Sequence, residues 1–230
     1  MKKIFEKHET LFCMLLIVLY VVICSYCRQN FGLTDYRSAI IHTVLSVVLL
    51  ALVISLKRVS FYGLSKVTDL KKYLYFIPIL LILSVNLWNG VNINNTASEI
   101  LFYIISMMNV GFLEEMIFRG FLFKMMAKDN IKSAIIVGSI TFGMGHIVNL
   151  LNGAGLLSTL MQICYATAIG YLFITIFYKS KSLVPCIIAH GVFNSLPILS
   201  VGGVSPYIET VFLVVVSLSY AFYINKRVKE

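Results

Sequence analysis

Charged residues are scarce in this sequence of 230 amino acids, and acidic residues are the scarcest of them. Charged side chains make up 13% of the chain and hydrophobic ones 59%, whereas a soluble domain usually has about 25% charged and 45–50% apolar residues. This balance disfavours a water-soluble enzyme, a disordered chain and a secreted disulfide scaffold at once. It is typical of a polytopic membrane protein.

The few charges that are present are mostly positive, and the net charge is +9. In a soluble protein such an excess would indicate nucleic acid. In a membrane protein basic loops set the topology and meet anionic lipid, so we expect the lipid bilayer as a partner and no nucleic acid.

Eight apolar segments predict an all-α, polytopic transmembrane helical bundle, because a helix needs about 20 apolar residues to cross the hydrocarbon core. They run over residues 10–27, 39–56, 73–91, 100–123, 131–149, 156–178, 183–200 and 207–224. The first segment is expected to be a retained span and not a cleaved signal, since no small-x-small site follows it. We expect one integral membrane domain over residues 1–230.

The basic residues divide unevenly between the two ends of these spans. If the N-terminus is cytoplasmic, sixteen basic residues fall on the cytoplasmic side and only Arg28 and Arg37 on the other. The positive-inside rule therefore predicts that both termini are cytoplasmic. The remaining basic residue, Arg119, lies inside the fourth span.

Several polar side chains stand where lipid would surround them unless they face the protein interior. A charge at bilayer depth costs roughly 2.5–3.5 kcal/mol, so such residues by default indicate function. The candidates are Glu114, Glu115, Arg119, His146, His190 and Asn194, with His42 near the start of the second span. From the helical rise, Glu114, His190 and His146 lie about 15, 13 and 21 Å from one edge, so they can meet at one level.

The spacing on the fourth span separates the two glutamates. Glu115 and Arg119 are four residues apart and share a helix face, which predicts a structural ion pair. Glu114 is turned by roughly 100° from Glu115. We therefore expect Glu114 to be free for chemistry.

The same spacing recurs on the other two spans. Phe142 and His146 share one face, and so do His190 and Asn194. We predict that Glu114, His146, His190 and Asn194 converge in one cavity, nearer the cytoplasmic side. Taken alone, these residues are compatible with a hydrolytic site, an ion or proton pathway, or structural hydrogen bonding between helices.

Three motifs, in order along the chain, resemble those of the CPBP intramembrane protease family. They are Glu114-Glu115-x-x-x-Arg119, Phe142-x-x-x-His146 and His190-x-x-x-Asn194. The family includes CAAX prenyl endopeptidases of the Rce type and bacterial Abi-type and bacteriocin-immunity proteins. The motifs span residues 114–194, so the catalytic core is expected within about 100–200.

The resemblance implies hydrolysis of a peptide bond inside the membrane, by one of two schemes. Without metal, Glu114 is the general base, His146 holds the water, and His190 and Asn194 stabilise the oxyanion. With metal, Glu114, His146 and His190 bind one Zn²⁺. Glu115, Arg119 and Phe142 support the site in both. The absence of an H-E-x-x-H motif favours the glutamate base.

The substrate class follows less directly from the sequence. The small size, short loops and Lys-, Ile- and Asn-rich composition suit a bacterial member of the family, located in the plasma membrane. We expect a membrane-delivered peptide or membrane-protein substrate. The alternatives are a non-catalytic bacteriocin-immunity or scaffold protein and a small transporter, although no inverted repeat supports the latter.

Overall fold

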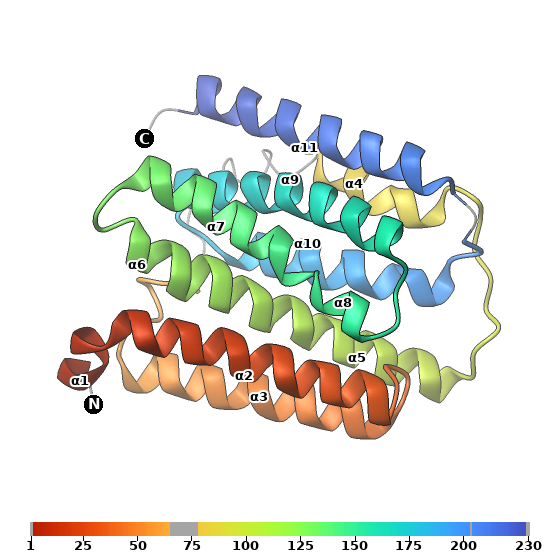
Figure 1. The fold of residues 1–230 in the computed structure, drawn as a ribbon, viewed down its shortest axis with the longest axis horizontal. Coiled ribbons are helices and arrows are strands. Elements are labelled where there is room, and N and C mark those ends of the chain that lie inside the picture. Colours follow the sequence, from red (N-terminus) through yellow and green to blue (C-terminus); the bar gives the residue numbers. More distant parts are fainter. Residues whose placement is uncertain (1, 65–77, 203, 229–230) are drawn as a thin grey trace.

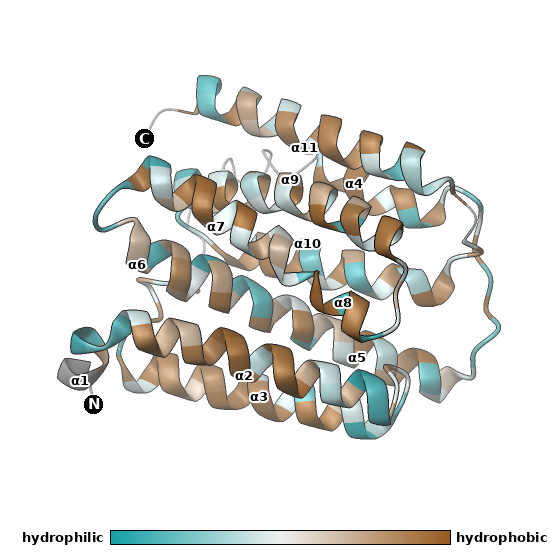
Figure 2. Cartoon of the chain, in the orientation of Figure 1, coloured by the Kyte–Doolittle hydropathy of each residue, from teal (hydrophilic) through white to brown (hydrophobic). Residues whose placement is uncertain are grey.

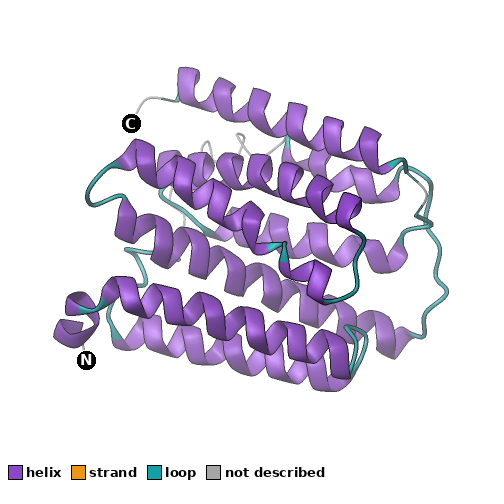
Figure 3. Ribbon diagram, viewed as in Figure 1, coloured by secondary structure: helices purple, strands orange, loops and turns teal. Residues whose placement is uncertain are grey.

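The structure, a computed structural model, describes residues 2–64, 78–202 and 204–228. All named elements in these residues are helices, and Figure 3 shows no strand among them. Six helices are long and apolar enough to cross a membrane. The expected all-α helical bundle is confirmed, with fewer full-length spans in the described residues than the eight predicted.

The helices follow one another with short connections. Their bounds are α1 Lys2–Lys7, α2 Glu9–Asn30, α3 Tyr36–Ser55, α4 Ile79–Ser84, η2 Val85–Leu87, α5 Ala97–Glu114, η3 Glu115–Phe123, α6 Lys124–Met126, α7 Ile131–Gly145, α8 Val148–Leu151, α9 Leu156–Ser180, α10 Val184–Ser195, η4 Leu196–Leu199 and α11 Pro206–Arg227. Three of the long helices, α3, α5 and α7, start at a side chain that caps them. Thr96 and Glu99, for example, form a reciprocal capping box at α5, which satisfies backbone N–H groups that a helix start leaves unpaired.

Two of the eight expected spans differ from the prediction. Residues 73–77 of the segment 73–91 lie outside the described residues, and the described helix ends at Leu87. The chain then turns through Gly90, whose φ of 101° suits glycine, into a bridge between Val91 and Ser200. The segment 183–200 forms the twelve-residue helix α10 and the four-residue turn η4, too short together to cross the hydrocarbon core.

The helices form a bundle in which α1 and the last turn of α11 lie at the same end, which we call the end with the termini (Figure 1). Helix α9 packs between α7 and α11, and α5 packs against α3 and α10. The crossing of α5 and α10 is close: a Cβ added to Gly111 would lie 2.6 Å from the backbone nitrogen of Gly191. Glycine at both positions therefore lets the two backbones meet.

The outer surface of the bundle is apolar. Figure 2 shows hydrophobic residues along the middle of the helices and hydrophilic ones gathered at the helix ends and connections. On α2, Leu11, Met14, Leu15, Val18, Leu19 and Val22 are all more than half exposed. An apolar surface of this extent fits a hydrocarbon environment and not water.

One continuous helix carries the two glutamates. It begins as α5, widens into the π-helix η3 over Glu115–Phe123 and ends as α6. Eight of the nine residues of η3 are buried, all except Leu122. A π-helix of this length is rare, and such segments frequently occur at functional sites.

Candidate active site

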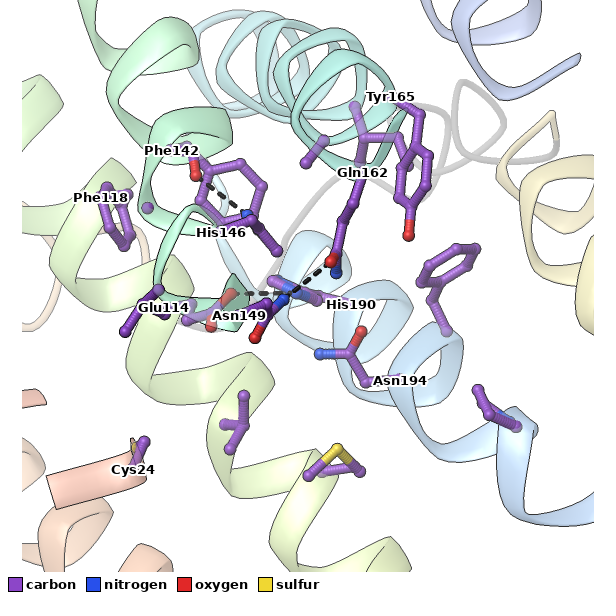
Figure 4. A pocket seen from close by; sticks show the side chains of 18 of the residues that line it. Cys24, Glu114, Phe118, Phe142, His146, Asn149, Gln162, Tyr165, His190 and Asn194 are labelled. Carbon is purple, nitrogen blue, oxygen red and sulfur yellow. Dashed lines mark hydrogen bonds and ion pairs between the residues drawn. The ribbon is translucent and has the colours of Figure 1, made fainter. Parts of the chain in front are cut away.

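A cavity of about 450 Å³ lies in the middle of the bundle. Glu114, His146, His190 and Asn194 all line it, and they come from three different stretches of the chain. Figure 4 shows them around one space, with Phe118 and Phe142 beside them. The structure thus brings together the four residues that the sequence singled out for chemistry. His42, the further polar candidate, is buried on α3 and lines the same cavity.

Glu114, at the end of α5, has partners that the spacing did not predict. Its Oε1 accepts a hydrogen bond of 2.5 Å from the hydroxyl of Tyr20 on α2. Its Oε2 lies 3.3 Å from Nε2 of His190, although without hydrogen-bond alignment. Glu114 is therefore held by Tyr20 through one oxygen, while the other is buried beside His190 without a hydrogen-bond partner.

Glu115 points away from the cavity and binds two partners. Its Oε1 lies 3.0 Å from a terminal guanidinium nitrogen of Arg119, and both side chains are fully buried. The same oxygen accepts a 2.7 Å hydrogen bond from Nδ1 of His190. The predicted Glu115–Arg119 pair is thus present, and it has a third member that the sequence did not indicate. Through that contact Glu115 orients the imidazole, leaving Nε2 beside Glu114.

Phe142 is the ring around which the charged groups pack. The guanidinium carbon of Arg119 lies 3.9 Å from its centroid, a cation–π distance. The rings of His146 and His190 approach it edge-on, with centroids 5.4 and 5.7 Å away. Phe142 therefore packs against Arg119 and against both histidines.

His146 is the residue at which α7 ends. Its Nδ1 lies 3.2 Å from the carbonyl oxygen of Phe142 in the preceding turn. Because a carbonyl only accepts, this contact places the hydrogen on Nδ1 and leaves Nε2 as an acceptor.

Tyr20 is the site residue that sequence reasoning missed. It lies 94 positions before Glu114, so no local spacing links the two. The position of Tyr20 in its span could nevertheless have indicated it. Membrane tyrosines gather at the interfaces, whereas Tyr20 stands mid-span, where its hydroxyl needs a partner inside the protein.

The cavity extends in the direction opposite to our expectation. We placed it nearer the end that carries the termini, but its lining continues to Arg28, Asn149 and Gln162 at the far ends of α2, α8 and α9. These three side chains are linked by hydrogen bonds of 3.1 Å, from Arg28 to Asn149, and 2.7 Å, from Asn149 to Gln162.

Aromatic packing explains this difference. At the end with the termini, the ring of Phe121 packs against Phe5, Phe12 and Tyr62 at centroid distances of 6.1, 5.6 and 4.6 Å. These rings fill the space between the glutamates and the end with the termini. The cavity therefore continues from the glutamates toward the opposite end of the bundle. Counting helical rise from the basic residues gave depth but could not detect this packing.

The zinc scheme requires Glu114, His146 and His190 to surround one ion. Within residues 2–64, 78–202 and 204–228, no group of three or more His, Cys, Asp or Glu side chains is arranged to hold a metal ion. His190 binds Glu115 through Nδ1, and Nδ1 of His146 lies against the carbonyl oxygen of Phe142. This geometry does not fit three ligands on one ion, and we derive no step through a metal.

Residues 96–196 match the family model described as type II CAAX prenyl endopeptidase Rce1-like. This segment is similar to the Rce1-like family. The Rce1-like segment starts at the cap of α5 and ends at the start of η4, so it contains the three motifs but neither α2 nor α11. No curated protein and no solved structure matches the chain significantly.

The Rce1-like segment and the apolar helices together define the class of protein. Members of the family are described as endopeptidases, which hydrolyse peptide bonds. Six described helices have the length and hydropathy of membrane spans. The protein is therefore an integral membrane protein with a segment that is similar to a protease family.

Proposed function

We propose that the protein hydrolyses a peptide bond of a membrane-delivered peptide or membrane-protein segment, with Glu114 as general base. The observation that carries this proposal is the cavity that Glu114 shares with His146, His190 and Asn194 among apolar helices. A positioned base of this kind contributes about 10²–10⁴-fold to the rate.

The water molecule is bound between Glu114 and His146. Glu114 takes one proton, and the Nε2 acceptor of His146 receives the other O–H in a hydrogen bond. The water oxygen attacks the peptide carbon, and the carbonyl electron pair moves to oxygen. When the intermediate collapses, the leaving amine takes the proton from Glu114.

The oxyanion is stabilised by donors from α10. Asn194 supplies an amide N–H, and His190 supplies Nε2–H when it carries a proton. Because Glu115 fixes the imidazole through Nδ1, this nitrogen is oriented before substrate binds. One such donor accounts for roughly 10²–10³-fold in kcat.

The substrate enters as an extended segment. The cavity continues from Glu114 past polar groups such as Asn149 and Gln162 to the end of the bundle opposite the termini. Polar walls of this kind suit a peptide backbone, and the apolar outer surface suits a substrate that arrives within the bilayer. The substrate class is therefore a hydrophobic peptide, with or without a lipid anchor.

The test uses purified protein in liposomes with a panel of fluorogenic peptides, both farnesylated C-terminal peptides and unmodified hydrophobic ones. Glu114→Gln should lower hydrolysis at least 10²-fold. The matched control, Glu6→Gln, removes a carboxylate at the end with the termini and should leave the rate unchanged. Activity should also persist with 1,10-phenanthroline.

Two other outcomes would indicate a different mechanism or function. Loss of all activity with the chelator, restored by Zn²⁺, would replace the glutamate scheme with a metal one. Absence of hydrolysis by the wild type across the panel would favour a non-catalytic immunity or scaffold protein.

A further inference from the structure

The first long helix, α2, completes the cavity although it lies outside the Rce1-like segment 96–196. Tyr20, which is 9% exposed, reaches from α2 to Glu114 on α5. We infer that Tyr20 is a positioning residue for the general base, so that the active site is built from two separate parts of the chain. This inference rests on the function proposed above.

The hydrogen bond from Tyr20 has the length expected for a charged acceptor. At 2.5 Å it falls at the short end of the range for O–H···O⁻ contacts. A phenol in the middle of a membrane span has few partners, and a carboxylate is the strongest of them. The bond thus restrains the carboxylate at Oε1.

The contact gives the two carboxylate oxygens of Glu114 different neighbours. Oε1 is occupied by the hydroxyl of Tyr20, whereas Oε2 faces Nε2 of His190 at 3.3 Å. The side chain of Glu114 keeps 15% of its surface exposed, although Oε2 itself is buried and has no hydrogen-bond partner. Fixing Oε1 therefore leaves Oε2, beside His190, as the oxygen that has a bond still to make.

Helix α2 is itself held in register at both of its ends. At the end with the termini, Glu9 pairs with Lys128, and Arg58 lies 3.8 Å from Glu9. At the far end, Gln29 donates to the side-chain oxygen of Asn152 at 2.8 Å. These anchors set the height at which Tyr20 meets Glu114, on a helix whose opposite face is apolar and exposed.

The expected size of the effect follows from the geometry a base requires. Displacing a catalytic group by about 1 Å costs up to 10²-fold in rate. Without the hydroxyl, Glu114 keeps its charge but loses the hydrogen bond that positions its carboxylate. Tyr20→Phe should therefore lower kcat about 10- to 100-fold and change KM by less than about 3-fold, because the ring still fills the cavity wall.

The experiment compares kcat and KM of Tyr20→Phe and wild type on the best-cleaved peptide of the panel. Tyr26→Phe, on the same helix with an exposed ring, is the matched control and should behave as wild type. A second pair, Tyr20→Gln and Tyr20→Leu, has similar size but only glutamine can donate. Glutamine should restore kcat at least 10-fold relative to leucine, a difference that helix packing alone would not produce.

Several results would overturn the inference. Wild-type kcat in folded Tyr20→Phe refutes it and leaves the proposed function intact. If Tyr20→Phe does not fold, equal kcat in the glutamine and leucine variants refutes it. A change confined to KM would assign Tyr20 to substrate binding instead. Absence of hydrolysis by the wild type refutes both the proposed function and this inference.

Discussion

Replacing Glu115 by glutamine is expected to destabilise the protein strongly, because it leaves the charge of Arg119 without a counterion. Both side chains are fully buried, and the guanidinium sits over the ring of Phe142. Breaking a buried pair in a soluble protein costs about 3–5 kcal/mol. The substitution also weakens the hydrogen bond that orients His190.

In a membrane we expect the loss of stability to lie in the lower part of that range. In the unfolded but inserted chain, Arg119 would reach water or lipid headgroups, and the cost of an arginine in a membrane helix is then about 2.5–3.5 kcal/mol. We therefore expect a loss of about 3 kcal/mol, which corresponds to a more than 100-fold shift of the folding equilibrium. Adjacent Glu114, which has some exposure, should tolerate the same change with a smaller loss.

The loss is measured by SDS-induced unfolding in mixed micelles, followed by circular dichroism. The double variant Glu115→Gln/Arg119→Gln is the control, since it removes both charges and should recover most of the stability. An unfolding midpoint of Glu115→Gln equal to that of the wild type would show that Arg119 does not depend on Glu115, and the reasoning from burial would be wrong.

Two further predictions concern packing and topology. Gly111→Ala places a methyl group 2.6 Å from the backbone of Gly191, so it should lower stability by about 1–3 kcal/mol in the same assay, whereas Gly145→Ala, with its nearest neighbour at 3.7 Å, should be tolerated. In a cysteine-free background, cysteines at Asn94 and Lys128 should react with an impermeant maleimide from opposite sides, with Lys128 on the cytoplasmic side. Reaction of both from one side would contradict the topology.

The parts of the molecule that the sequence predicted are those governed by local spacing. Apolar runs located the long helices, and the four-residue interval predicted the contact of Glu115 with Arg119. Contacts between distant segments were not predictable in this way. Periodicity contains no information on the approach of Tyr20 to Glu114 or of His190 to Glu115.

The prediction of where the cavity extends was wrong for a related reason. Helical rise estimates the depth of each residue along its own axis, but the empty volume depends on which side chains fill the space between axes. Phe121 and the rings around it occupy one end, and no single-helix pattern distinguishes them from lipid-facing aromatics. Hydropathy also predicted a full span at residues 183–200, where α10 has only twelve residues and the apolar helical stretch ends at Leu199.

The π-helix η3 makes the register of the helix Ala97–Met126 tolerant of the loss of one residue. Its hydrogen bonds reach one residue further than those of an α-helix, so it accommodates an additional residue within otherwise regular helix. Deleting one residue between Arg119 and Phe123 would let the segment relax to an α-helix. Everything after the deletion, including Lys124, would then keep nearly its present direction about the helix axis while Glu114 stays in place, because the π-helix already accommodates the additional residue. A one-residue deletion in this stretch should therefore leave the meeting of the basic end of the helix with the membrane surface unchanged, whereas the same deletion in an α-helical stretch would turn that end by roughly 100°.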